Sequence, residues 1–234
     1  MEELKNIHAI AQALLRQSFP LEPVKLKHQM PVRPPRALGL VNIKGEVFHS
    51  EKISRMVFLR ISLPIYLTIH SMFIRPKWEY DLPVFATEVV TYGKRRMVIT
   101  DIHRSGINTD HDDEALFDRM TLLRNGYPDL NAHAMTLKGK IQTVFSRAAF
   151  LARLPNNQKD DQILALFKDY LDLFSSLLRE AAPLDGERRH ETERAYQDYL
   201  RTVVDHDPGV KGFKKLFGAK EGMARAMNLH FEDY

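Results

Sequence analysis

The sequence predicts an α+β protein, a three-layer α/β/α sandwich around a central, mostly antiparallel β-sheet. Short β-branched and aromatic runs separated by turn residues fill residues 38–103, which is typical of an antiparallel meander. Apolar residues recur with helical periodicity near the N-terminus and after Pro155. Because strands and helices do not alternate, a doubly wound fold is disfavoured, and the 234 residues are expected to form a single domain, 1–234.

The meander is expected to supply about five strands. Their expected bounds are Gly39–Asn42, Ile53–Leu63, Tyr66–Arg75, Val84–Tyr92 and Arg96–His103, with turns at Lys44-Gly45, Pro76–Asp81 and Gly93-Lys94. The polar and acidic stretch 106–135 indicates an excursion from the sheet, and 141–153 is compatible with either strand or helix.

Helices are expected at both ends of the chain. Residues 4–15 form an amphipathic pattern that Pro20 closes, and an apolar stripe over 163–178 predicts a core helix. A more polar helix at 187–204 and a last helix at 209–217 follow, the latter ended by Gly218 as a C-terminal cap.

Composition excludes several kinds of chemistry. The chain has no cysteine, so it cannot hold a disulfide, a thiolate metal site or an iron–sulfur cluster. It also has no glycine-rich dinucleotide or phosphate loop. The acidic run 110–114, taken with His103 and His111, matches no metal-ligand spacing and is expected to be a solvated loop, so no metal site is predicted. Electrons for any redox reaction would therefore have to come from a partner.

No apolar run is long enough to cross a bilayer and no signal-peptide core is present, so a cytoplasmic protein is expected. Basic residues form two clusters, which could attract an acidic partner or simply be solvated. The clusters are Lys94, Arg95 and Arg96, and Lys211, Lys214 and Lys215. A nucleic-acid-binding module is disfavoured because the sequence has no RNA-binding motif, zinc finger or interleaved aromatic platform.

Two polar residues interrupt apolar strands and are the first candidates for chemistry. If the Pro76–Asp81 turn is centred near Glu79, His70 and Glu88 face each other across a hairpin. An imidazole and a carboxyl group in such a pair can hold a transferable proton near neutrality. The alternative is a surface pair with little role.

Two further carboxylates, Asp207 and Asp101, have a simpler structural explanation or no assigned role. Asp207 precedes Pro208 at the start of the last helix, where a helix N-cap is the simplest role. Asp101 interrupts an apolar strand but could also lie at its solvated end, so it receives no role.

Several of these segments resemble the ferredoxin-dependent bilin reductases, especially the phycocyanobilin:ferredoxin oxidoreductase-like branch. The resemblance covers about half of the chain in order and spacing. It rests on Ile53–Leu59, Ile69–Phe73, Tyr80–Phe85 with Glu88, Ile99–Ile102, Tyr199–Pro208, Leu216–Gly218 and Leu229–Phe231.

The resemblance implies the α/β/α sandwich and a ferredoxin-dependent reduction of biliverdin IXα without a bound cofactor. It places His70 and Glu88 at the positions of the family's catalytic histidine and aspartate, and Asp207 at that of a second proton donor. Lys138, Lys140 and Arg147 are candidates to bind the two propionates of the substrate, and the two basic clusters are candidates to dock ferredoxin. A monomer is expected.

Two departures from the family pattern bear on the product. Glu88 is one methylene longer than the usual aspartate, which leaves the carbon that receives the proton open. The stretch Val57–Arg60 has no carboxylate to protonate a vinyl group, so phycoerythrobilin or a dihydrobiliverdin is favoured over phycocyanobilin. A non-catalytic tetrapyrrole-binding or carrier protein of the same fold is the alternative.

Overall fold

The sheet is built from consecutive antiparallel strands. A computed structural model describes residues 2–28, 30–103, 110–136 and 139–231. Within these residues the strands form one seven-stranded sheet, in chain order throughout. They are β1 (Glu22–Pro23), β2 (Asn42–His49), β3 (Ile53–Leu63), β4 (Leu67–Pro76), β5 (Val84–Tyr92), β6 (Arg95–His103) and β7 (Phe150–Pro155).

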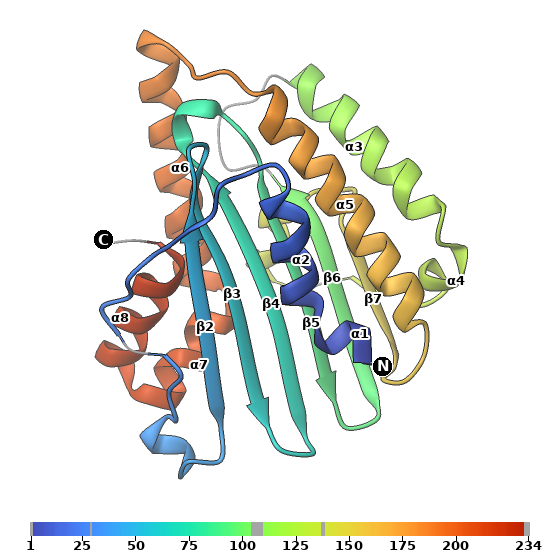
Figure 1. Cartoon of the computed structure of the whole chain (residues 1–234), viewed down its shortest axis with the longest axis vertical. Helices are drawn as coiled ribbons and strands as arrows, with labels where there is room; N and C mark the ends of the chain where they lie inside the picture. Colours follow the sequence, from blue (N-terminus) through green and yellow to red (C-terminus); the bar gives the residue numbers. More distant parts are fainter. Residues whose placement is uncertain (1, 29, 104–109, 137–138, 232–234) are drawn as a thin grey trace.

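Helices cover both faces of this sheet (Figure 1). The α-helices are α1 (Glu2–Lys5), α2 (Ile7–Arg16), α3 (Asp110–Asn125), α4 (Pro128–Asn131), α5 (Asp160–Glu180), α6 (Gly186–His206), α7 (Pro208–Phe217) and α8 (Ala219–His230). Three short 3₁₀ turns are η1 (Pro35–Ala37), η2 (Trp78–Tyr80) and η3 (Lys140–Val144). The predicted three-layer α+β sandwich is confirmed.

One face of the sheet carries the main core. Alternate residues of β3 to β6, among them Phe58, Met72, Phe85 and Ile102, pack under α2 and α5 in one apolar cluster. The apolar stripe predicted over 163–178 supplies the buried side of α5, which includes Phe167 and Phe174. We call this side the α5 face and the opposite side the α6 face.

A second core closes part of the α6 face. Val57 and Leu59 of β3 pack against Phe213 of α7 and Leu229 of α8. Gly45 allows this close packing, because a Cβ atom there would lie 3.0 Å from Leu229 Cδ1. Helices α7 and α8 therefore cover β2 and β3, while α6 packs on η2 and η3 and reaches the ends of β4 and β6 at Arg75 and His103.

Some expected boundaries were wrong. The first expected strand, Gly39–Asn42, contains a turn instead: Leu38 and Gly39 have positive φ angles, and β2 begins only at Asn42. The Lys44-Gly45 turn is absent, because Gly45 pairs with Leu59 inside the ladder. The ambiguous stretch 141–153 divides into η3 and β7.

The excursion after β6 is confirmed, but its acidic run 110–114 begins helix α3 and is not a loop. Gly218 ends α7 as predicted.

Candidate functional site

The pairing of β4 with β5 decides which side chains meet. Ser71 lies opposite Glu88, and His70 lies opposite Val89. Successive side chains of a strand point to opposite faces, so Glu88 lies on the α6 face and His70 on the α5 face. The predicted pairing of His70 with Glu88 is therefore wrong. The loop between the strands contains η2 and a left-handed Asp81 (φ 45°), which moves the register by one residue from the expected one.

His70 belongs to the main core. Its ring centroid lies 5.2 Å from that of His8 on α2, and 7% of the residue is exposed. Burial and the neighbouring charge of Arg60 lower the pKa of His70 to about 4. Burial and the charge of His70 lower the pKa of His8 to about 4 as well. Both imidazoles are neutral at neutral pH, and His70 is separated from Glu88 by the sheet.

The α6 face is more open than the α5 face over β4 and β5. On β4, Ile69, Ser71 and Phe73 are partly exposed, whereas the intervening His70, Met72 and Ile74 are buried. On β5 the same contrast separates the partly exposed Ala86, Glu88 and Val90 from the buried Phe85, Thr87 and Val89. We call the partly exposed set the sheet floor. It is mostly apolar and has one carboxyl group near its middle.

The surroundings of Glu88 raise the pKa of its carboxyl group. Desolvation and the negative charge of Asp207 raise the pKa of Glu88 to about 7, against a smaller opposing effect of the Ser71 hydrogen bond. A substantial fraction of this carboxyl group is therefore protonated at neutral pH. A protonated acid on an apolar floor is suited to general acid catalysis.

Asp207 has the predicted capping role. Its Oδ1 accepts a hydrogen bond from the backbone N–H of Val210, 3.0 Å away, at the start of α7. The same carboxylate influences Glu88, Tyr199 and His230, so it lies at the cleft as well as at the helix. Capping and a role at the cleft are therefore compatible.

A second polar group occupies the β6 side of the cleft. Asp101 is fully buried and accepts hydrogen bonds from Ser146 N (2.8 Å) and Ser146 Oγ (2.5 Å). Its Oδ2 lies 3.5 Å from His103 Nδ1, and His103 Nε2 lies 2.8 Å from Tyr199 Oη. Burial raises the pKa of Tyr199, and the charges of Tyr196, Asp207 and Asp101 raise it further.

Sequence reasoning missed the roles of His103 and Tyr199 in this group. The spacing of Asp101 and His103, two residues apart on a strand, was the available signal, because such residues share a face. The contact with Tyr199 on α6 depends on tertiary packing. His230 was also missed: its ring lies 6.0 Å from Phe73, and burial lowers its pKa despite the opposing charge of Asp207.

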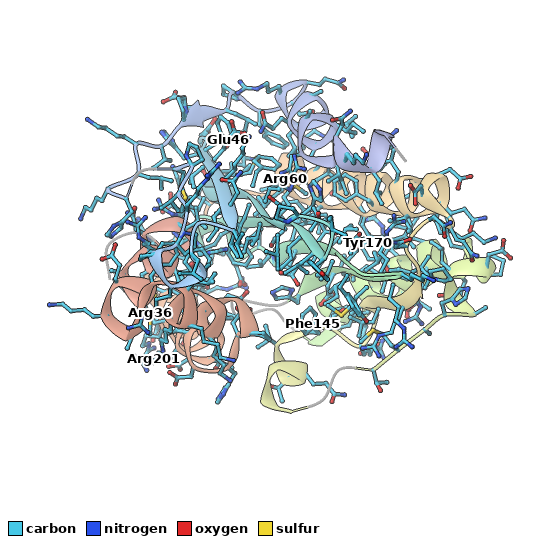
Figure 2. The ribbon with its side chains drawn as sticks, turned by 90° about the horizontal axis from the view of Figure 1, so that it is seen from below. Arg36, Glu46, Arg60, Phe145, Tyr170 and Arg201 are labelled. Carbon is cyan, nitrogen blue, oxygen red and sulfur yellow. The ribbon has the colours of Figure 1, made fainter. Side chains whose placement is uncertain are left out.

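A cleft of about 380 Å³ opens between η3 and α6. It is lined by Phe117, Thr143, Val144, Phe145, Ser146, Arg147, Tyr199 and Thr202. Arg147 is thus at its rim, where it pairs with Glu114 and lies over the Phe117 ring. Lys138 and the side chain of Lys140, the other two predicted propionate ligands, lie outside the described residues. Figure 2 labels Phe145, which belongs to the segment beside this cleft.

The basic residues predicted to dock ferredoxin differ in their exposure to solvent. Lys94 and Arg95 are exposed at the β5–β6 turn, and Lys211 and Lys215 are exposed on α7, where Lys214 is partly buried. Arg96 is 4% exposed, pairs with Asp160 and donates to the carbonyl group of Asn156. Its inclusion among the docking residues is wrong, because strand alternation points it to the α5 face.

Within the described residues, no helix is long and apolar enough to cross a membrane. No group of three or more histidine or acidic side chains in that part of the chain is arranged to hold a metal ion.

A mostly apolar, partly exposed sheet face that carries a carboxyl group with a raised pKa is suited to bind an apolar ligand and to donate a proton to it. A family model described as ferredoxin-dependent bilin reductase matches residues 8–225. The chain belongs to this family.

The relatives that this chain resembles are named as ferredoxin oxidoreductases of bilins. The chain is 23% identical over 200 residues to 15,16-dihydrobiliverdin:ferredoxin oxidoreductase of Nostoc punctiforme, covering 85% of this chain and 82% of the relative. It is 24% identical over 178 residues to phycoerythrobilin:ferredoxin oxidoreductase of Prochlorococcus marinus, covering 74% and 70%. The fold matches that of phytochromobilin synthase from tomato in complex with biliverdin, with a TM-score of 0.83, 20% identity, and 97% and 82% of the two chains covered.

Proposed function

We propose that the protein reduces biliverdin IXα, or a closely related linear tetrapyrrole, with electrons from ferredoxin. The observation that carries this proposal is the position of Glu88, a partly protonated carboxyl group on the sheet floor, close enough to Asp207 for their charges to interact. Saturation of one carbon–carbon double bond consumes two electrons and two protons. Ferredoxin would supply the electrons one at a time, and Glu88 and Asp207 are the proposed proton donors.

The sheet floor fits the chemistry of the substrate. A linear tetrapyrrole is flat and largely apolar, and Ile69, Phe73 and Val90 offer it an apolar surface beside the donors. Its two propionates need cations, for which Arg147 at the cleft rim is proposed together with Lys138 and Lys140. Because Arg147 already pairs with Glu114, substrate binding would exchange one carboxylate partner for another.

We propose phycoerythrobilin or a dihydrobiliverdin as the product. Two relatives are named for 15,16-dihydrobiliverdin and for phycoerythrobilin. On β3, the α6-face positions Val57 and Leu59 are apolar and covered by α7 and α8, so no carboxyl group there can protonate a vinyl substituent.

Ferredoxins are acidic, and Lys94, Arg95, Lys211, Lys214 and Lys215 are proposed to attract one. A single bilin reductase domain that acts as a cytoplasmic monomer completes the proposal.

The test is anaerobic absorbance spectroscopy with biliverdin and reduced ferredoxin, followed by chromatography of the product. A coloured complex that is consumed by reduced ferredoxin supports the reductase. A coloured complex that stays unchanged would support a carrier protein of the same fold and would refute catalysis. Absence of any complex would refute both.

A further inference from the structure

The end of the sheet at which β2 begins and β3 turns into β4 exposes large apolar side chains. Leu38 is 88% exposed, Leu40 61%, Ile65 95% and Tyr66 69%, and these make up four of the six large apolar side chains that are exposed in the described ranges. Leu38 and Leu40 follow η1 and lead into β2, and Ile65 and Tyr66 form the β3–β4 turn. Both segments lie along the lower edge of the sheet in Figure 1, beside the β5–β6 turn. We call these four residues the apolar edge.

Folding does not explain the residue types found there. Ile65 has a φ angle of 71° and Leu38 one of 49°, in the left-handed region that favours glycine or asparagine. A β-branched side chain in that conformation is strained, and here it also points its apolar surface into water. Local stability would thus improve with glycine at Ile65, so the isoleucine is better explained by a contact with another molecule.

Hydrogen bonding joins the neighbouring turns into one surface. The backbone N–H of Gly93, in the β5–β6 turn, donates to the carbonyl oxygen of Tyr66, 3.1 Å away. Ile65 and Tyr66 therefore lie next to the exposed Lys94 and Arg95.

Positive charge also flanks the other end of the apolar edge. The Arg36 guanidinium lies against Gly218, where a Cβ atom would be 3.0 Å from Arg36 Nη2, so η1 packs on the end of α7. Figure 2, which looks onto this edge from below, shows Arg36 against the C-terminal helices. Arg36 is itself exposed and precedes Leu38 by two residues, so it supplies a positive charge at the Leu38 end.

The apolar edge is continuous with the sheet floor. Tyr66 directly precedes β4, whose α6-face residues Leu67, Ile69 and Ser71 are partly exposed and lead inward. Gly93 likewise follows β5, where Tyr92 and Val90 lead to Glu88. At about 3.3 Å per residue, the five residues from Gly93 to Glu88 span roughly 17 Å. A ligand above the floor would lie closer than that to a protein docked at the edge.

We infer that the apolar edge is the docking surface for the acidic iron–sulfur protein that supplies electrons. This inference rests on the proposed function and adds the surface through which its electrons enter. Leu38, Leu40, Ile65 and Tyr66 form the desolvated centre, and Lys94, Arg95 and Arg36 flank it, the usual arrangement of an apolar interface core with a charged rim. Each docking event passes one electron from the reduced cluster to the bound tetrapyrrole.

The test compares a double variant, Ile65→Gly with Tyr66→Ser, with a matched control, Leu122→Ser. Glycine suits the φ angle at Ile65, so the fold should persist. Leu122 is 72% exposed on α3 and belongs to neither the edge nor the cleft. Steady-state rates are measured against the concentration of an acidic [2Fe–2S] ferredoxin, and ferredoxin binding to the bilin-free protein is measured by calorimetry.

We expect the double variant to raise the KM for ferredoxin, and weaken calorimetric binding, by tenfold or more. Its affinity for biliverdin and its rate with a photoreduced small-molecule donor should stay within twofold, and Leu122→Ser should change nothing. An unchanged KM and unchanged calorimetric affinity would overturn the inference. So would a double variant that loses binding to anionic phospholipid vesicles but keeps its ferredoxin affinity, since the edge would then be a membrane contact. Failure of the unsubstituted protein to bind biliverdin would refute the proposed function instead, and calorimetry would still decide the docking surface.

Discussion

Ser71 lies directly opposite Glu88 in the β4–β5 ladder, and its side chain hydrogen-bonds the Glu88 carboxyl group. This bond lowers the pKa of Glu88, whereas burial and the charge of Asp207 raise it, and the net pKa is about 7. The proton on Glu88 is thus controlled by one neighbour on the sheet and one at the start of α7.

Glu88→Gln should abolish most of the turnover of biliverdin. Glutamine keeps the shape of the side chain but cannot donate a carboxyl proton, and losing a general acid costs about 10²- to 10⁴-fold in rate. Single-turnover absorbance changes with reduced ferredoxin provide the measurement. Biliverdin affinity should be retained, and Thr91→Ser, a partly exposed site on the same strand but on the other face, is the control. Turnover within threefold of the unsubstituted protein would remove Glu88 from the mechanism.

The rate should fall as the pH rises through about 7, because the active form of Glu88 is the protonated one. Asp207→Asn removes the negative charge that helps to raise the pKa of Glu88, so the fall should move to lower pH. Asparagine also caps helices, so α7 should stay intact. The pH profile of kcat for both proteins is the measurement. An identical midpoint in the two profiles would contradict the electrostatic coupling of Asp207 to Glu88.

His70→Gln should leave turnover within about threefold, because the sheet separates His70 from the cleft. Its effect should be on stability. The pKa values of His70 and His8 are lowered to about 4 in the folded protein, from 6.5. The unfolded chain then binds more protons between these values, so stability is complete above pH 6.5 and is lost as the pH falls toward 4. The loss should reach about 2 kcal/mol at pH 5 for the well-buried His70.

Denaturant unfolding of the unsubstituted protein and of His70→Gln at pH 7 and pH 5 measures this loss. The variant should show the smaller difference between the two pH values. A large loss of turnover in His70→Gln with normal stability would show that His70 has a catalytic role after all.

Arg96→Ala and Arg95→Ala should behave differently although the residues are adjacent. Arg96 is buried, pairs with Asp160 and donates to the carbonyl group of Asn156, so removing it deletes these charged contacts and should destabilise the fold by about 1.5–3 kcal/mol. Arg95 is exposed, and its removal should change stability by less than about 0.5 kcal/mol while raising the KM for ferredoxin at low salt. Urea unfolding and ferredoxin titration separate the two effects. Equal stability of both variants would contradict the structural role of Arg96.

Local sequence patterns were enough to predict the layers of the fold and the segments of the site. The apolar stripe of α5, the alternation in β3 to β6 and the Leu82–Phe85 stretch before Glu88 all depend on neighbours within one element, where periodicity is reliable. Gly218 at the end of α7 and Asp207 at its start are local signals of the same kind. The membership in the bilin reductases rests on these patterns too.

Contacts between elements were decided only by tertiary structure. Side chains alternate between the two faces of a strand, so a register that differs by one residue from the expected one changes the face on which a residue lies. The η2 loop sets a register in which Ser71, and not His70, lies opposite Glu88, and His70 points to the α5 face. The bond from His103 to Tyr199 and the burial of Arg96 against Asp160 each join residues more than sixty positions apart. The sequence by itself thus determined the family, the layers and the carboxyl group at Glu88, because those follow from local pattern. Strand register and helix packing set the partners of that carboxyl group. Local sequence pattern does not fix the register to within one residue, and it does not predict helix packing.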